Sequence, residues 1–182
     1  MNIFIGSDHA GYQLKEYLRN TLAELGHRVI DCGAYTYNEK DDYPVYISKV
    51  AKAVSEAEEL RSIEQDSPTL EATPRDISVS GEIQETRGIV IGGSGQGEAI
   101  VANKYKHVRA ALCYGGVDAD VIVTLSREHN NANVLSLGAR FIPSDKVIEL
   151  VLLWLNTPFG GDERHVRRLG EIEEISHTPL YE

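Results

Sequence analysis

The sequence has few cysteines and no long apolar run, and acidic residues outnumber basic ones. Its 182 residues include two cysteines, Cys32 and Cys113, which fit neither a disulfide framework nor a zinc site. We therefore expect a reducing, cytoplasmic location. Lysine and arginine number 18 against 28 aspartates and glutamates, for a net charge of −10. This balance argues against a general nucleic-acid binder, which needs a basic face.

Membrane and export signals are also missing. No apolar stretch reaches the roughly 18 residues that a membrane-spanning helix needs. The N-terminal residues MNIFIGSDHAGY lack a basic leader followed by a long apolar stretch, so we expect no secretory signal. We therefore expect no membrane partner.

Short apolar runs alternate with longer helical patterns. Apolar content is 42% and charged content 25%, which is typical of a globular chain that buries one core. Strands are predicted at 2–6, 28–31, 88–91, 109–113 and 133–137. Helices are predicted at 11–25, 44–58, 97–104, 117–127, 144–155 and 162–176, with Gly26 as a helix stop and Ser144 as an N-cap. The alternation predicts an α/β protein, a three-layer Rossmann-like fold with a five-stranded, mainly parallel sheet.

One acidic segment interrupts this alternation. Residues 59–86 contain seven acidic residues against two arginines, together with Pro68, Pro74 and Gly81. We interpret the segment as a surface insertion, with a short hairpin at 76–84; a partner-binding arm is the alternative. The prediction is a single domain over 1–182, with this insertion and a charged C-terminal helix at 162–176.

A glycine-rich turn follows the third predicted strand. Residues 92–97 read GGSGQG, and such a turn exposes backbone N–H groups that can hold a phosphate or an oxyanion. The pattern matches neither a Walker A motif nor the Rossmann GxGxxG. Glu98 comes next, where a carboxylate would repel a phosphate but would suit a base beside an oxyanion hole. A favourable charge at a helix N-terminus is the alternative for Glu98.

Other polar residues also stand at the ends of predicted elements. Asp8 and His9 follow the first strand, where an α/β sheet binds ligands, although a helix N-cap is an equal alternative for Asp8. His129 lies in a polar turn that ends a helix, a position typical of a partner for the helix dipole. Arg164 and Arg168 are four residues apart on one helix face and would make a phosphate clamp, or ion pairs with Glu163, Glu171 and Glu173.

Five motifs, in order, resemble those of the type B ribose-5-phosphate isomerases. They are IGSDHAGY at 5–12, DDYP at 41–44, GGSGQGE at 92–98 with ANK at 102–104, REHNNANV at 127–134, and RHVRR at 164–168. The resemblance covers the chain except 59–86. It implies cofactor-free, metal-free isomerisation of a sugar phosphate in pentose phosphate metabolism. We also expect a homodimer or tetramer with shared active sites, because Asp8 and the glycine turn follow strands whereas His129 precedes the fifth strand and so lies at the opposite edge of the sheet.

The resemblance also implies roles for individual residues. Many members of the family carry a cysteine just before the glycine turn, where this chain has Gly92; members without it use a glutamate just past the turn, which matches Glu98. His129 and Asp8 would then open the sugar ring, and Ser94 would move the hydroxyl proton. The residues implied in substrate binding are His9, Tyr43, Gly93, Gly95, Gln96, Gly97, Asn130, Arg140, Arg164 and Arg168.

Two other functions remain open at this stage. An isomerase of a hexose 6-phosphate such as allose 6-phosphate would use the same residues. A non-catalytic sugar-phosphate-binding module would need neither Glu98 nor His129, yet both are present. A nucleotide-binding regulator lacks its expected phosphate motif.

Overall fold

The computed structural model describes residues 1–66 and 85–175. Its five strands form one sheet with the order β2-β1-β3-β5-β4, and all neighbouring pairs are parallel. The strands are β1 (Asn2–Ser7), β2 (Arg28–Asp31), β3 (Thr86–Gly92), β4 (Ala110–Cys113) and β5 (Val134–Gly138). The helices are α1 (Tyr12–Glu24), α2 (Tyr43–Asp66), α3 (Gln96–Ala102), α4 (Ala119–Glu128), α5 (Ser144–Asn156) and α6 (Glu163–Ile175). The predicted α/β class and five-stranded sheet are confirmed.

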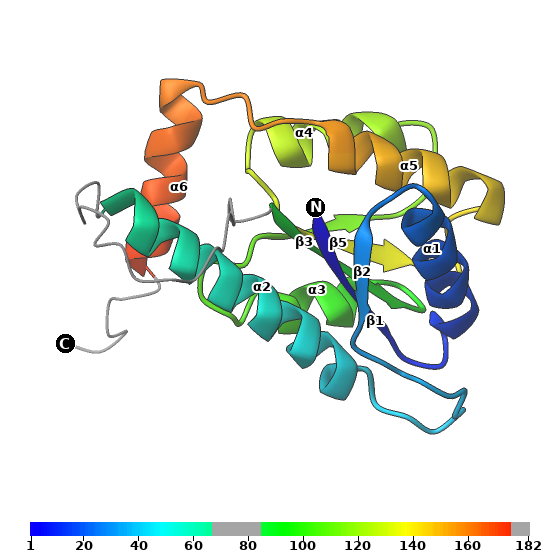
Figure 1. Ribbon diagram of the computed structural model, residues 1–182. Coiled ribbons are helices and arrows are strands. Elements are labelled where there is room, and N and C mark those ends of the chain that lie inside the picture. Colours follow the sequence, from blue (N-terminus) through cyan, green and yellow to red (C-terminus); the bar gives the residue numbers. More distant parts are fainter. Residues whose placement is uncertain (67–84, 176–182) are drawn as a thin grey trace.

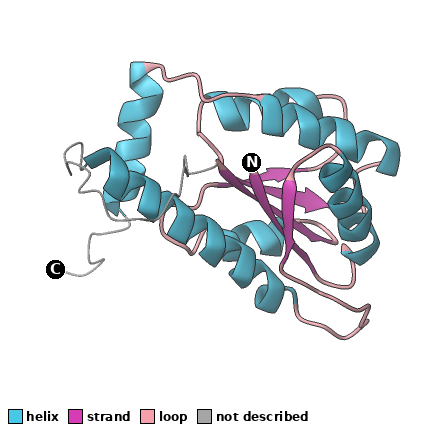
Figure 2. Ribbon diagram, in the orientation of Figure 1, coloured by secondary structure: helices cyan, strands magenta, loops and turns pink. Residues whose placement is uncertain are grey.

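Helices cover both faces of the sheet (Figures 1 and 2). On one face Ile89, Ile91 and Leu135 pack in a core shared with α1, α4 and α5. On the other face Val90 and Val134 pack against α2 and α3. The alternation of side chains along β3 and β5 thus feeds two cores, which makes the three layers.

The helix stop at Gly26 is confirmed. Gly26 has a φ of 87°, and the N–H of His27 donates to the carbonyl of Leu22 at 3.1 Å, the pattern of a helix closed by a left-handed glycine. The N-cap assigned to Ser144 is wrong. Ser144 is the first residue of α5, Pro143 takes the cap position, and no side chain there caps the helix.

The second helix is longer than its sequence pattern predicts. We expected it to end near residue 58, but α2 continues to Asp66, so the first residues assigned to the insertion are helical. Leu60 and Ile63 are exposed there, and the helix is held by ion pairs: Glu58 contacts Arg61 at 3.4 Å and Arg109 at 3.7 Å. Because these apolar residues are exposed, they do not continue the buried apolar face of the helix, and the helical periodicity of apolar residues used for the prediction is lost there. The predicted hairpin at 76–84 lies outside the described residues.

The last helix stands beside the amino-terminal ends of the strands (Figure 1). Glu173 of α6 contacts His107 at 3.0 Å and Arg109 at 3.1 Å, and both of these residues precede β4. Within 1–66 and 85–175, no helix is long and apolar enough to cross a membrane.

Candidate active site

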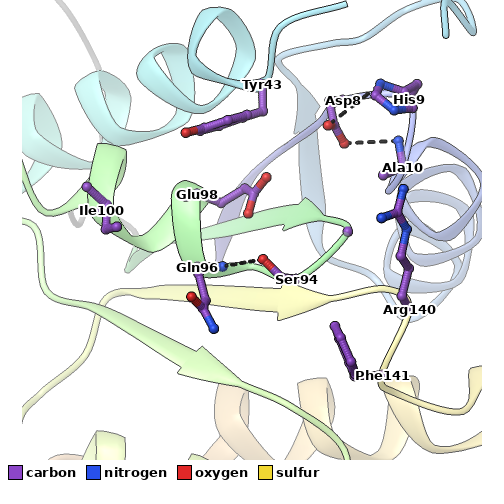
Figure 3. A pocket seen from close by; sticks show the side chains of 12 residues that line it. Asp8, His9, Ala10, Tyr43, Ser94, Gln96, Glu98, Ile100, Arg140 and Phe141 are labelled. Carbon is purple, nitrogen blue, oxygen red and sulfur yellow. Dashed lines mark hydrogen bonds and ion pairs between the residues drawn. The ribbon is translucent and has the colours of Figure 1, made fainter.

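A cavity of about 560 Å³ opens at the carboxyl ends of the central strands. The helix after β1 packs on one face of the sheet and the helix after β3 on the other, so the loops diverge between these neighbouring strands, where α/β sheets bind ligands. Figure 3 shows the side chains that surround the space. The cavity is lined by Asp8, His9, Ala10, Tyr43, Gly93, Ser94, Gln96, Gly97, Glu98, Ile100, Arg140 and Phe141.

Glu98 is the buried carboxylate of the cavity. Only 4% of the residue is exposed, and its side chain points from α3 toward the space between Asp8 and Ser94 (Figure 3). Burial raises the pKa of the Glu98 carboxyl, and the nearby Asp8 charge adds to the increase, while hydrogen bonds from the backbone of Glu98 and Gly95 lower it in part. A raised pKa favours proton transfer near neutral pH, which suits a general base.

Gly92 makes room for this carboxylate. A Cβ atom at Gly92 would overlap the carboxylate of Glu98, so a side chain at position 92 and the observed position of Glu98 exclude each other. The carboxylate thus fills the space where the resemblance would otherwise place a cysteine. Neither Cys32 nor Cys113 lines the cavity.

The glycine turn is fixed by hydrogen bonds to two of its backbone carbonyls. Gly95 has a φ of 74° and forms the N-cap of α3, a conformation that favours glycine. The buried Ser136 of β5 donates a hydrogen bond from Oγ to the carbonyl of Gly95 at 2.6 Å, and the N–H of Arg140 donates to the carbonyl of Gly93 at 3.1 Å. Sequence reasoning missed Ser136, because a serine inside a buried strand carries no local signal of this contact.

The two polar side chains of the turn differ in orientation. Ser94 Oγ accepts a hydrogen bond from the N–H of Gln96 at 3.3 Å and lies near Glu98 in Figure 3. Gln96 instead points away from Glu98 in that view, and its Nε2 donates to the hydroxyl of Tyr114. The backbone of Gln96 lines the turn, while its side chain is engaged elsewhere.

Asp8 fixes the turn that follows β1. Its Oδ1 accepts hydrogen bonds from the N–H groups of Ala10 at 3.0 Å and Gly11 at 3.3 Å. The N-cap position of α1 belongs to Gly11, so Asp8 precedes the cap. The residue is 7% exposed, and Oδ2 lies 3.7 Å from Nδ1 of His9.

His9 is joined to Asp41 of the loop between β2 and α2. Oδ1 of Asp41 lies 2.9 Å from the backbone nitrogen of His9 and 2.8 Å from its ring Nδ1. This hydrogen bond, and the charges of Asp8 and Asp41, raise the pKa of His9 against the effects of burial and Arg140. Sequence reasoning noted the DDYP motif but gave Asp41 no role.

These three residues also raise the question of a metal. Asp8, His9 and Asp41 are the one group of potential ligands within 1–66 and 85–175 whose atoms approach within 4.8 Å of one another. Nδ1 of His9 and Oδ1 of Asp41 already bond to each other, so we interpret the group as a hydrogen-bonded cluster.

Tyr43 and Arg140 complete the walls. Tyr43 is the first residue of α2, and its ring packs so closely over Gly97 that a Cβ there would lie 2.7 Å from it. Arg140 comes two residues after β5, and its guanidinium lies against Gly93. In Figure 3 Arg140 and His9 flank one side of the cavity, and Glu98 and Tyr43 the other. The cavity thus has one side formed by Arg140 and by His9 with its neighbour Asp8, and another side that carries the buried Glu98.

Of the predicted site residues, Gly95 belongs to the glycine turn but does not line the cavity, and four others lie elsewhere. None of His129, Asn130, Arg164 and Arg168 lines the cavity formed by the described residues. His129 ends α4 before β5 begins, and its ring stacks on that of His165 in α6, with 4.3 Å between centroids and 11° between planes. This second cluster therefore lies at the amino-terminal edge of the sheet.

The arginines of the second cluster are exposed. Arg164 lies 3.7 Å from Asp162, and Arg167 pairs with Glu171 at 3.5 Å. Arg168 makes no ion pair with the part of the chain that the structure describes. The alternative of ion pairing with Glu163, Glu171 or Glu173 therefore does not account for Arg168.

The chain matches the model of the ribose/galactose isomerase family over residues 3–66 and 75–172, and it belongs to this family. The match is wider than the motif resemblance implied, because it leaves out 67–74 rather than the whole of 59–86. The chain is 34% identical to ribose-5-phosphate isomerase B of Mycolicibacterium paratuberculosis, over 98% of this chain and 93% of that protein.

Similar solved structures are also ribose-5-phosphate isomerases of type B. The Clostridium thermocellum ribose-5-phosphate isomerase B is 40% identical, with a TM-score of 0.75 over 97% of this chain and 98% of that one. The Mycoplasma genitalium enzyme, solved with bound ribulose 5-phosphate, is 32% identical, with a TM-score of 0.76 over 98% and 97%.

Proposed function

We propose that the protein interconverts D-ribose 5-phosphate and D-ribulose 5-phosphate through a cis-enediolate. The observation that carries the proposal is the buried Glu98 carboxylate beside the glycine turn, in a cavity that His9 and Arg140 also line. Membership of the ribose/galactose isomerase family and the similarity to ribose-5-phosphate isomerases B support it. The reaction reduces C1 and oxidises C2 of the same molecule, so it needs no external oxidant or reductant and no redox cofactor. With Glu98 as the base and backbone N–H groups for the oxyanion, we also propose no metal, in a cytoplasmic enzyme of pentose phosphate metabolism.

Glu98 moves the proton between carbons. From the aldose, its carboxylate takes the proton from C2, and the C–H electron pair forms the C1–C2 double bond while O1 becomes an oxyanion. Backbone N–H groups of Gly93 to Gly97 stabilise that charge, at about 3–4 kcal/mol per donor. Ser94 passes the hydroxyl proton from O2 to O1, and Glu98 returns its proton to C1, which leaves the ketone at C2.

Ring opening requires a second pair of groups. A proton must leave the O1 hydroxyl and another must reach the ring oxygen, and we assign these transfers to Asp8 and to the partner subunit's His129. His129 of the same chain lies at the other edge of the sheet, beyond the cavity. The proposal therefore includes a homodimer with two shared sites.

The phosphate is bound by cations from both subunits. His9 and Arg140 flank one side of the cavity, and the helix that carries Arg164 and Arg168 would bring both guanidinium groups from the other subunit. Tyr43, and Asn130 from the same partner segment as His129, line the sugar site. Arginine suits this role because its planar fork binds phosphate oxygens in pairs.

An isomerase assay in the presence of a chelator tests the function. We expect turnover of ribose 5-phosphate that EDTA does not reduce. The kcat/KM for ribose 5-phosphate should exceed that for allose 6-phosphate; the reverse order would make the protein a hexose phosphate isomerase. If the protein bound both sugar phosphates but converted neither, it would be a non-catalytic sugar-phosphate-binding module.

Arg168 should contribute to phosphate binding. In Arg168→Ala we expect KM for ribose 5-phosphate to rise about tenfold or more, since a charge-assisted hydrogen bond is worth roughly 1.5–3 kcal/mol. Affinity for unphosphorylated ribose should stay the same. Arg167→Ala is the matched control, because Arg167 is also exposed and already pairs with Glu171. Equal losses for both sugars would show that Arg168 does not contact phosphate.

A further inference from the structure

Asp41 does not line the cavity itself, but it contacts His9, which does. It lies 32 residues after His9, in the loop before α2, and its side chain is only 4% exposed. One oxygen, Oδ1, is within hydrogen-bond distance of both the backbone nitrogen and Nδ1 of His9. A single carboxylate oxygen therefore fixes both the main chain and the ring of His9.

This geometry decides which ring nitrogen can serve a ligand. A carboxylate only accepts hydrogen bonds, so Nδ1 must carry a proton to donate to it. Nε2 is then the nitrogen left for the cavity, which His9 lines with 28% of its side chain exposed. A buried carboxylate is costly unless a positive group accompanies it, and an imidazolium at His9 provides that charge.

We propose that Asp41 is a positioning residue for anion binding, which holds His9 as an imidazolium whose Nε2–H donates to the phosphate of the substrate. The proposal rests on the proposed function only for the identity of the phosphate ester. The chemistry it requires is a phosphate dianion beside His9 and Arg140.

The charged groups around His9 agree with this role. Asp8 and Asp41 favour its protonated form, while Arg140 opposes it. Asp41 also acts on Tyr46, whose pKa is raised chiefly by burial and next by the Asp41 charge, so the Tyr46 hydroxyl stays neutral. A bound phosphate adds negative charge next to His9 and must stabilise the imidazolium further.

The test combines an NMR titration of His9 with the affinity for inorganic phosphate. In the unliganded wild type, we expect the pKa of His9 to lie above its ordinary value and to rise further when phosphate saturates the site. In Asp41→Asn the pKa should fall by about one unit, because the carboxylate partner is gone. Phosphate affinity at neutral pH should then fall roughly fivefold to tenfold, and the pH at which binding is lost should shift downward with the pKa.

Asp42→Asn is the matched control. It removes the same charge from the neighbouring residue, which is exposed and is not among the groups that shift the pKa of His9. Its phosphate affinity should stay within about twofold of wild type, as expected for an exposed charge. In kinetics, Asp41→Asn should raise KM for ribose 5-phosphate more than it lowers kcat.

Three outcomes would overturn the proposal. The first is a wild-type His9 whose pKa does not respond to phosphate, a result that needs no variant to fold. The second is an Asp41→Asn protein whose His9 pKa falls while phosphate affinity stays constant. The third is an additional loss from Asp41→Asn in a His9→Asn background, which would show that Asp41 does not act through His9. Absence of isomerase turnover would refute the proposed function but leave the phosphate measurements valid.

Discussion

Glu98→Gln should bind ribose 5-phosphate almost as wild type does and lose at least about 10²-fold in kcat. Glutamine keeps the shape of glutamate but cannot accept a proton from C2. The residue is buried against Gly92 with its carboxyl pKa raised, so no solvent-exposed base can easily replace it. The measurement is steady-state kinetics together with the dissociation constant of a substrate analogue. A variant that kept more than a tenth of the wild-type kcat would refute the assignment.

The stability of Glu98→Gln separates lost chemistry from lost folding. A carboxyl whose pKa is raised in the folded state contributes stability that is fully present below its unfolded pKa and is lost as the pH rises through the folded pKa. At pH values above the folded pKa the wild type therefore bears the cost of a buried charge. Glutamine removes it, so at a pH where kcat has reached its plateau the Tm of the variant should equal or exceed that of the wild type.

The pH profile of the wild type follows from the same shift. A base must be deprotonated to act, so kcat should fall as the pH decreases through the raised pKa of Glu98. The acid limb should lie above the ordinary range of a glutamate carboxyl and disappear in Glu98→Gln.

A thiol alkylator should leave the activity intact, because Cys32 and Cys113 are buried and burial raises the pKa of each thiol to about 11. Rapid stoichiometric inactivation would instead indicate a catalytic cysteine.

The sequence predicted the sheet well because each strand is a short apolar run. β3 is buried along its whole length, so its pattern needed no knowledge of its neighbours. The glycine turn was equally local, since Gly92, Gly95 and Glu98 lie within seven residues. Position in an α/β sheet then predicted Asp8 at the mouth of a site, and Asp8 lines the cavity beside that turn. Arg140, which also lines it, was indicated only by the family resemblance.

Contacts between distant segments could not be predicted in this way. Asp41 meets His9 across 32 residues, and Ser136 meets Gly95 across 41, with no spacing rule to link them. The end of α2 was missed for a related reason, because Glu58 of this helix pairs with Arg109 of another segment. The last turns of α2 also expose the apolar residues Leu60 and Ile63. Long-range ion pairs and hydrogen bonds leave no periodic trace in a sequence.

The proposed shared site has a geometric basis. Asp8 and the glycine turn follow strands, whereas His129 precedes β5, and a five-residue parallel strand spans roughly 16 Å. The structure places His129 on His165, outside the cavity that holds Glu98. One imidazole cannot cover the length of the strand, which is why we propose that each site takes its His129 from the partner subunit.

Mixing two inactive variants tests this arrangement. When Glu98→Gln and His129→Asn exchange subunits, about half of the dimers are mixed, as random pairing requires. Each mixed dimer has one site with both defects and one intact site, so activity should recover to about a quarter of wild type. Glu98→Gln mixed with Asp8→Asn is the control: both residues line the same cavity of one chain, so every mixed site stays defective and no activity returns. If mass spectrometry shows exchange and the first pair also stays inactive, Glu98 and His129 serve a site within one chain, and the shared site is wrong.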